Sequence, residues 1–482
     1  MTVSAWTRWW WRAVNIVHDE VIVKSGFGAE LKVFLEQHPA IQMLEVLMPD
    51  MNGIFRCKRI HRSEFAALAE GALKCPVTQL LVTTMGEYDH EVDPQLVAGE
   101  PDNALWPVSG SLSPVHWLGS PTGQVMASQY ELDGSPAWVD PRHILQRVLN
   151  RYEELGYRPV IATELEFYLV RPGEGVTPLP LLGRIPGTGM EQQGIQYAMA
   201  EDMWQYDGFL DDVRIACEQQ SVPMTTMLCE FAPGQWEINT RHVDDPLLAC
   251  DHALLLKRIV KGVALKHGIS ATFMAKPFAQ SAGNGLHIHA SVYDREGNNI
   301  FADPDSDSVP ALSPLFRHAI GGLADTMHEA MAIFAPNANS YRRFVPGTYV
   351  PLSPSWGYNH RDVSVRIPVS SDENRRIEHR VAGADANPYL VAAAVLAGIH
   401  HGITQRCEPG PMIAEGTQLG DQEITLPNRW EQALVAFDGS AVLPTYLGRD
   451  YCSAFSSMRR AECDAFHARI SNLDYEWYLR AV

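Results

Sequence analysis

The spacing of hydrophobic positions along the chain changes near residue 136. Between about residues 26 and 135, apolar runs are short and are separated by turn-forming residues, which predicts a strand-rich region. Within it, MLEVLMPDMNGIFRCKRI (residues 43–60) has two apolar runs on either side of Pro49–Gly53, a pattern typical of a β-hairpin. Beyond residue 136, longer helical stripes alternate with short strands. We predict an N-terminal extension over residues 1–25, a small β-rich domain over residues 26–135 and a larger α+β domain over residues 136–482.

Three helices of the larger domain are predicted to begin in the same way, with an acidic or amide residue followed by proline. In WVDPRHILQRVLNRYEELGY (residues 138–157), Asp140 is expected to cap the helix, Pro141 to be its first residue and Gly156 to end it. Its apolar stripe consists of Ile144, Leu145, Val148, Leu149 and Tyr152. The pairs Asp245-Pro246 and Asn387-Pro388 predict two further helix starts, the second in an alanine-rich segment.

Three segments between these helices carry polar residues two positions apart. Residues at i and i+2 of a strand share one face, so each pair is predicted to point to the same side of a sheet. The segments are TELEFYLV with Glu164 and Glu166, NGLHIHASV with His287 and His289, and RRIEHRV with Glu378 and Arg380. Each pattern alone is more often a solvated face or a hydrogen-bonded pair than a site, but their joint occurrence in one domain favours a shared function.

A fourth segment, CEFAPGQWEIN (residues 229–239), places Glu230 and Glu237 on either side of a Pro-Gly turn in apolar surroundings. Burying one unpaired carboxylate is costly, and burying two close together is more so. If all these faces point inward, five glutamates and a histidine give a charge of about −5, which requires cations. Oxygen-rich ligands without thiolates suit Mg²⁺ or Mn²⁺ better than Zn²⁺, and six ligands predict two ions.

The segment 342–380 is rich in arginine. Its members are Arg342, Arg343, Arg361, Arg366, Arg375, Arg376 and Arg380. A basic surface patch is the simplest interpretation, but several of them alternate with apolar residues. Guanidinium groups beside metal ions are suited to phosphates and carboxylates, which indicates phosphoryl transfer from ATP to a carboxylate. The chain has neither a P-loop nor a dinucleotide-binding glycine motif, and AQSAG (residues 279–283) lacks the first glycine of a nucleophile elbow.

Composition narrows the class of protein. The 482 residues carry a formal net charge of −19, which argues against nucleic acid or an anionic membrane as a partner. The eight cysteines include no C-x-x-C pair, as expected for reduced thiols in a cytoplasmic protein. No window approaches about 20 uninterrupted apolar residues, so no membrane span is predicted. The Trp-rich N-terminus is interpreted as an extension, since no cleavage site follows it.

These segments resemble, in order, the motifs of glutamine synthetases: TELEFYLV, CEFAPGQWEIN, AGNGLHIHASV, NSYRRFVPG, NHRDVSVRIP and RRIEHRVAGADANPYL. The resemblance covers roughly residues 40 to 400. It implies an α+β protein, with a β-grasp-like N-domain and a catalytic domain whose antiparallel strands line a funnel. It also implies a homo-oligomer, a dodecamer of two hexameric rings, in which the neighbour's N-domain completes each active site.

The same resemblance assigns site residues. It implies that one Mg²⁺ or Mn²⁺ is held by Glu166, Glu230 and Glu237, and a second by Glu164, His287 and Glu378. Gly283 and Arg343 would bind L-glutamate, and Arg361 and Arg380 would stabilise the transferring phosphate. Arg366 and Arg376 would lie near the ATP phosphates, and His289 and Ser291 near the nucleoside. Arg343, Arg361 and Arg380 are therefore the expected catalytic residues.

The chain departs from glutamine synthetases where ammonium is handled. Tyr349, in TYVP, stands where the family has a flap glutamate, and TTMGEYD (residues 83–89) replaces the expected ammonium-site motif. Glu373 stands where a basic residue near the nucleotide is frequent. SWGYNHRDVSVRIP is similar to the γ-glutamyl-amine ligase branch of the family. A site with metals and arginines but without the ammonium pocket is expected to accept a different nucleophile.

We therefore predict an ATP-dependent ligase that joins the γ-carboxylate of L-glutamate to a polyamine or monoamine through γ-glutamyl phosphate. Glu87, Asp89 and Tyr349 are candidates for taking the proton of the amine. Trp204, Tyr206 and Trp356 are either an aromatic wall for the amine or ordinary core. The alternatives are a glutamine synthetase with a diverged flap, a non-catalytic scaffold with this fold, and a dinuclear metallohydrolase.

Overall fold

The computed structural model describes residues 19–88, 92, 97–173, 177–194, 197–304, 310–419 and 424–482, with side chains from residue 26 onward. The described chain divides into two compact units. The first contains the residues up to Met48 together with Phe55–Val77 and Glu100–Ala137. The second contains Pro49–Ile54, the described part of Thr78–Gly99, and Trp138–Val482. The loop of the predicted hairpin thus belongs to the second unit, although its strands lie in the first.

The first unit is built on a mixed sheet. Its strands are β1 (Met43–Pro49), β2 (Phe55–His61), β3 (Lys74–Pro76), β4 (Asp102–Pro107), β5 (Ser113–Val115) and β6 (Thr122–Tyr130). They follow the order β2-β1-β6-β4-β3, with β5 also paired to β6. β1 runs parallel to β6, whereas β4 and β5 run antiparallel to it. Two helices, α1 (Asp19–Gln37) and α2 (Phe65–Ala69), accompany this sheet.

The predicted hairpin is confirmed, because β1 and β2 are neighbours in this sheet. Within the connecting loop, the Asp50 carboxylate accepts hydrogen bonds from the backbone N–H groups of Asn52 at 2.8 Å and Ile54 at 2.9 Å. Gly53 has a φ of +71°, which a residue with a side chain adopts only at a cost. The Asn-Gly signal therefore marks the turn correctly.

Helix α1 differs from the expectation. The residues from 26 to 37 were predicted to be strand-rich and instead continue a helix that begins at Asp19 and crosses the predicted limit of the N-terminal extension. Phe27, Leu31 and Phe34 form its buried stripe. A Cβ atom on Gly123 of β6 would lie only 3.1 Å from the Phe34 ring, so this glycine makes room for the helix. Packing against the sheet thus determines the helical state.

The second unit contains a larger sheet that confirms the predicted antiparallel architecture. Its strands are β7 (Arg158–Arg171), β8 (Leu179–Pro180), β9 (Met224–Cys229), β10 (Gln235–Thr240), β11 (Ser270–Thr272), β12 (Leu286–Tyr293), β13 (Trp356–Tyr358), β14 (Val365–Ile367) and β15 (Ile377–His379). The order is β13-β14-β15-β12-β7-β10-β9, with β11 and β8 also paired to β7. All the described pairings are antiparallel except that of β13 with β14.

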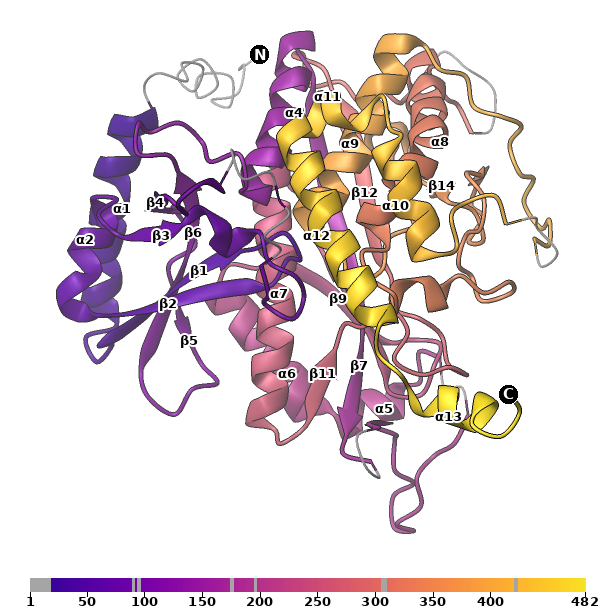
Figure 1. Ribbon diagram of the computed structural model, residues 1–482, viewed down its shortest axis with the longest axis horizontal. Coiled ribbons are helices and arrows are strands. Elements are labelled where there is room, and N and C mark those ends of the chain that lie inside the picture. The colour runs from indigo at the N-terminus through magenta and orange to yellow at the C-terminus, as the bar shows by residue number, and fades with distance from the viewer. Residues whose placement is uncertain are drawn as a thin grey trace, which may run out of the picture. The chain divides into compact units, whose positions relative to one another are not determined.

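Helices make up the rest of the second unit (Figure 1). They are α4 (Pro141–Leu155), α5 (Ala200–Gln205), α6 (Asp207–Gln219), α7 (Pro246–Lys266), α8 (Pro314–Phe334), α9 (Pro388–Gln405), α10 (Trp430–Asp438), α11 (Leu443–Leu447), α12 (Arg449–His467) and α13 (Asn472–Tyr478). The three proline-led starts are confirmed, since Asp140, Asp245 and Asn387 each cap their helix by accepting a backbone N–H. No helix in the described ranges is both long and apolar enough to cross a membrane.

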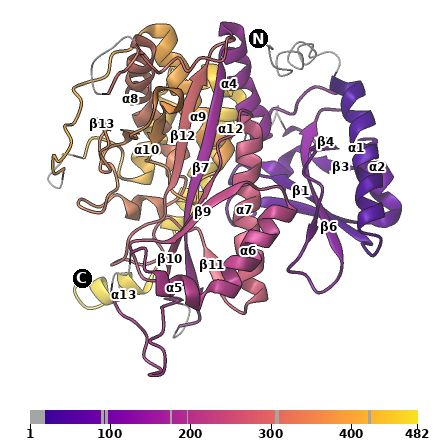
Figure 2. The same cartoon turned by 180° about the vertical axis from the view of Figure 1, so that it is seen from behind.

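The helices cover one face of the large sheet. Helices α4 and α7 contact β7, and α9 contacts α4, α7 and β12, so that β7 and β12 lie side by side in front of a helical layer (Figure 2). Phe167 of β7 packs on Phe273 at a ring distance of 5.4 Å, and Phe273 in turn lies 5.9 Å from Lys257 of α7. Because side chains alternate along a strand, Glu164 and Glu166 point to the face of β7 opposite Phe167.

Candidate active site

Strand register brings the predicted acids and histidines into one polar row. Residues directly opposite each other on neighbouring strands share a face of the sheet. The opposed pairs are Glu237 with Glu166, Glu164 with His287, His289 with Glu378, and Arg366 with Glu378. The row thus crosses β10, β7, β12, β15 and β14. Glu164 with Glu166 and His287 with His289 each share a strand face, as the sequence pattern predicted, whereas Arg380 follows the last residue of β15.

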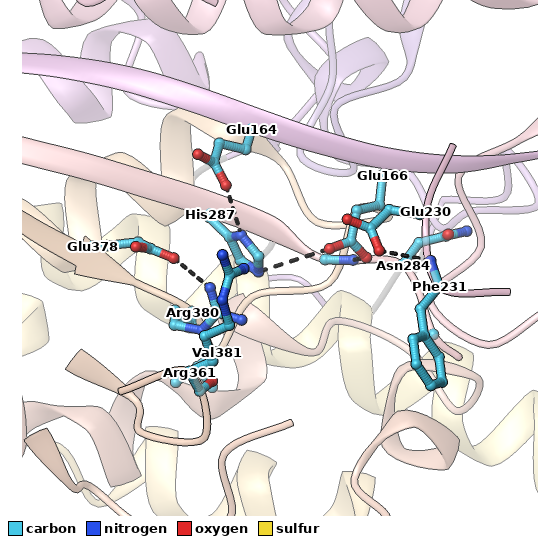
Figure 3. Close-up of polar contacts among 12 residues, drawn as sticks. Glu164, Glu166, Glu230, Phe231, Asn284, His287, Arg361, Glu378, Arg380 and Val381 are labelled. Atoms are coloured by element: carbon cyan, nitrogen blue, oxygen red, sulfur yellow. Dashed lines mark hydrogen bonds and ion pairs between the residues drawn. The ribbon is translucent and has the colours of Figure 1, made fainter. Parts of the chain in front are cut away.

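One group in this row consists of Glu164, His287 and Glu378, each of which has a potential ligand atom within 4.8 Å of the others. The Glu164 Oε2 lies 3.0 Å from His287 Nδ1 (Figure 3). Its Oε1 lies 2.8 Å from His289 Nε2. Burial would raise the pKa of Glu164, but the hydrogen bonds from His287 and His289 outweigh it and hold this pKa well below its usual range. Glu164 is therefore ionised and held in place by two histidines.

A second group consists of Glu166, Glu237 and His287, whose ligand atoms also lie within 4.8 Å of one another. Glu166 Oε2 accepts a hydrogen bond from Gly285 N at 2.7 Å, and His287 Nε2 lies 3.9 Å from Glu166 Oε1. His287 is thus shared between the two groups. Glu230, which the family resemblance places here, accepts a hydrogen bond from Phe231 N at 2.7 Å and stands beside Glu166 in Figure 3.

The acids at this end of the row disfavour one another's ionisation. Burial raises the pKa of Glu237 to about 9, and the carboxylates of Glu164, Glu166 and Glu230 add to the rise. Burial and Glu166 raise the pKa of Glu230 to about 7. Such a cluster gains from a cation that replaces the protons. Because its donors are carboxylate oxygens and one imidazole, the residues fit a hard divalent ion such as Mg²⁺ or Mn²⁺.

Arginines surround the other end of the row. Arg366 Nη1 lies 2.7 Å from Glu378 Oε2, and Arg380 Nη1 forms an ion pair with Glu378 Oε1. Burial would raise the pKa of Glu378, but the charge of Arg380 outweighs it and lowers this pKa to about 2. Glu378 therefore anchors two guanidinium groups at the end of the carboxylate row.

Arg343 is held close to the same point. Its Nη1 donates to Val381 O at 2.7 Å and its Nη2 to Arg380 O at 3.3 Å. Arg380 Nε in turn donates to the carbonyl oxygen of Arg361 at 3.1 Å. Arg343 and Arg380 are buried, whereas Arg361 is exposed. The three predicted catalytic arginines are thus linked through backbone carbonyls.

Gly283 lies against this arginine group. A Cβ atom at this position would be 2.6 Å from Ala275 O and 2.7 Å from Arg343 Cγ, so only glycine fits. The surrounding loop is held by Gln235, whose Nε2 donates to Gly283 O at 2.9 Å and to Asn284 Oδ1 at 3.0 Å. No role was predicted for Gln235 or Asn284. The only signal for them in the sequence was their place inside the GQWEIN and AGNGLH segments.

The residues expected near the nucleotide lie within the row or beside it. His289 Nδ1 accepts a hydrogen bond from Arg376 Nε at 3.2 Å, while its Nε2 contacts Glu164. Ser291 is buried, and its hydroxyl donates to Arg375 O at 2.9 Å. Arg376 and His289 therefore belong to the same network as the carboxylates, and the Ser291 hydroxyl is used in holding the Arg375 backbone.

The residues considered for the acceptor amine are dispersed. Trp356 is buried with its Nε1 donating to Gly410 O at 2.8 Å, which makes it core. Tyr206 packs on Trp236 at a ring distance of 5.6 Å, and Trp204 is exposed. Tyr349 packs on Phe231. Glu87 is exposed, and Asp89 lies outside the described residues.

Comparison with known proteins gives a consistent result. Residues 138–478 match the family described as glutamine synthetase, catalytic domain. The γ-glutamylputrescine synthetase PuuA of Escherichia coli is 39% identical over 97% of this chain and 99% of its own, and the glutamate–isopropylamine ligase of a Pseudomonas species is 30% identical over 94% and 98%. The solved GmaS/ADP complex superposes with a TM-score of 0.78 at 25% identity, covering 93% of this chain and 98% of its own. The chain belongs to the glutamine synthetase family, in its γ-glutamyl-amine branch.

Proposed function

We propose that the protein is an ATP-dependent ligase that joins the γ-carboxylate of L-glutamate to an organic amine. The observation that carries this proposal is the polar row itself, with buried carboxylates suited to divalent cations at one end and three linked arginines at the other. Relatives named as a γ-glutamylputrescine synthetase, a glutamate–isopropylamine ligase and a γ-glutamylethanolamide synthetase support an organic amine as the acceptor. Aligned along one sheet face, these groups can hold two polyanions against each other.

The carboxylates would hold two or more Mg²⁺ or Mn²⁺ ions. Glu164, His287 and Glu378 form one ligand set, and Glu166 and Glu237 form the other, with Glu230 beside them and His287 within reach of both. A divalent ion at such a site offsets phosphate charge and orients the transferring group. Glu230 accepts from Phe231 N through Oε2, which leaves Oε1 for a metal ion.

The arginines would bind the substrates. Arg343 and Gly283 lie together and are assigned to L-glutamate, because a buried guanidinium suits a small carboxylate. Arg380 and the exposed Arg361 are assigned to the transferring phosphoryl group. Arg366 and Arg376 are assigned to the ATP phosphates, and His289 and Ser291 to the side of the site facing the nucleoside.

The proposed reaction has two steps. The γ-carboxylate of glutamate first attacks the γ-phosphate of ATP, giving γ-glutamyl phosphate and ADP, while Arg361 and Arg380 stabilise the charge on the transferring group. The neutral amine then attacks the acyl phosphate, and inorganic phosphate leaves. An alkylammonium has a pKa of about 10, like lysine, so the protein must take a proton from the ammonium group before the amine attacks.

The proposed assembly is a homo-oligomer, a dodecamer of two hexameric rings, in which a neighbour's N-domain (residues 26–135) completes the site of each catalytic domain (residues 136–482). The family membership supports this assembly. Light scattering of the purified protein measures its mass and tests the proposal directly. A stable monomer that is fully active would contradict the shared site.

The function is tested by ADP release from purified full-length protein with ATP, Mg²⁺ and L-glutamate. Ammonium is compared with putrescine, spermidine, ethanolamine, methylamine and isopropylamine. Release that depends on an organic amine, with little from ammonium, is the expected result. Preference for ammonium would make the protein a glutamine synthetase. Absence of release with every acceptor, while ATP and metal both bind, would leave a non-catalytic scaffold.

A further inference from the structure

Two aromatic rings stand at the rim of the carboxylate row. Phe231 and Tyr349 come from segments far apart in the sequence, and their ring centroids lie 5.9 Å apart at an interplanar angle of 72°. This nearly perpendicular arrangement presents the face of one ring beside the edge of the other. Both side chains remain open to solvent, with exposed fractions of 41% for Phe231 and 56% for Tyr349. The pair therefore forms two walls of an accessible corner.

The backbone holds Tyr349 in an unusual conformation. Its φ is +57°, in the left-handed region that residues with large side chains seldom occupy. Such a conformation costs free energy and persists where surrounding structure or function requires it. In this protein the conformation brings the ring of Tyr349 against Phe231, although the contact leaves more than half of Tyr349 exposed.

The corner adjoins the acids of the site. Phe231 follows Glu230 directly in the sequence. Its backbone N–H donates to the Glu230 carboxylate, so the Phe231 side chain branches from the backbone next to that carboxylate. Burial and the charges of Glu230 and Glu237 raise the pKa of Tyr197, and the charge of Arg361 opposes them. An alkyl chain of a few carbon atoms could therefore extend from the carboxylates to the rings.

We infer that Phe231 and Tyr349 determine the acceptor specificity of the proposed ligase and select an aliphatic diamine. One nitrogen of the diamine enters the site and is acylated. Its methylene chain lies along the Phe231 ring, and its second nitrogen stays an ammonium over the two ring faces. Aromatic faces attract ammonium groups. The inference rests on the proposed function and specifies its substrate class.

The test compares putrescine, butylamine and methylamine as acceptors for the wild type and for Phe231→Ala, Tyr349→Ala and Tyr349→Phe. Butylamine has the same chain as putrescine without the second ammonium, and methylamine reaches neither ring. In both alanine variants, kcat/KM for putrescine relative to methylamine is expected to fall at least about tenfold, mainly through KM. Tyr349→Phe keeps the ring and is expected to stay within about threefold of the wild type. In the alanine variants, the ratio of kcat/KM for putrescine to kcat/KM for butylamine should also fall.

Controls separate the possible causes. Phe466→Ala removes a ring of similar exposure (47%) from α12 and should leave all three acceptors unchanged. KM for glutamate and ATP should stay unchanged in every variant. An equal loss for methylamine, or no change in the ratio, would overturn the inference, as would dissociation of the oligomer, which would make the rings an interface. If the wild type releases no ADP in response to any amine, the proposed function itself is wrong.

Discussion

Glu237 and Glu378 lie on the same face of one sheet, yet their neighbours drive their pKa values in opposite directions. Burial would raise the pKa of both. Around Glu237 the nearby charges are carboxylates, which add to the rise to about 9. Around Glu378 they are Arg380 and two histidines, which reverse it to about 2. At the scale of single residues, the protonation of each acid is thus decided by the charges of the side chains around it.

The first prediction concerns Glu237→Gln. At neutral pH the metal-free wild type carries a proton on this carboxyl when folded, since its pKa is raised to about 9, but loses it on unfolding, so the amide should raise the melting temperature of the metal-free protein. Its apparent affinity for Mg²⁺ or Mn²⁺ should fall at least about tenfold, because a ligand is lost. Isothermal titration calorimetry measures this affinity. Glu218→Gln, which removes an exposed carboxylate paired with Arg214, is the matched control; equal affinities in the two variants would contradict the site.

The second prediction concerns Lys257 in α7, whose Nζ donates to Ala386 O at 3.0 Å. Burial, with a smaller effect from Lys261, lowers the pKa of Lys257 to about 7, whereas in the unfolded chain it lies near 10.5. Between these values the unfolded state binds more protons, so this residue makes stability rise with pH.

Lys257→Met removes that dependence. As the pH falls from 9 to 7, the free energy of unfolding of the wild type is expected to decrease relative to that of the variant. The difference grows by up to about 1.4 kcal/mol per pH unit. Chemical denaturation at several pH values measures the difference. A difference that stays constant with pH would show that Lys257 keeps its proton when folded.

At the scale of elements, α8 and α9 touch through glycines. A Cβ atom on Gly402 of α9 would lie 2.0 Å from His318 O and 2.7 Å from Gly322 N of α8. A Cβ atom on Gly322 would lie 2.2 Å from Gly398 O. The two helix backbones approach too closely for any side chain, and α9 in turn contacts β12, which carries His287 and His289.

The third prediction follows from this contact. Gly402→Ala forces the two helices apart and should destabilise the protein by about 1–3 kcal/mol. Gly410→Ala, at a position where a Cβ atom meets nothing within 4 Å, should be neutral. Thermal denaturation of both variants checks the difference. If the two variants have the same melting temperature, the close approach of α8 and α9 does not contribute to stability.

The elements also show where sequence patterns succeed. Asp140, Asp245 and Asn387 cap their helices as predicted, because a cap depends on residues within one turn. Helix α1 was missed, since Gly26, Gly28 and its valines favour a helix poorly, and only packing of its apolar stripe on the sheet compensates. Local signals therefore predict element ends better than they predict elements imposed by packing.

At the scale of the whole molecule, a formal charge of −19 and a buried group of acids both favour cations. The fourth prediction is that Mg²⁺ or Mn²⁺ raises the melting temperature of the metal-free protein and that a chelator reverses the rise, since an ion bound only by the folded state stabilises it. Differential scanning fluorimetry gives the readout. Sodium chloride at equal ionic strength is the control, and an equal rise with it would indicate general screening in place of a bound ion.

The sequence by itself determined the polar residues, the strand faces on which they lie and the helix starts, because alternation and capping depend on neighbours along the chain. It also placed Gly283 beside Arg343 through family motifs. Only the tertiary structure decided that His287 lies between two carboxylate groups, that Gln235 and Asn284 hold the Gly283 loop, and that Tyr349 meets Phe231. Those contacts join segments distant in sequence, and strand register and loop packing, which no local pattern encodes, bring them together.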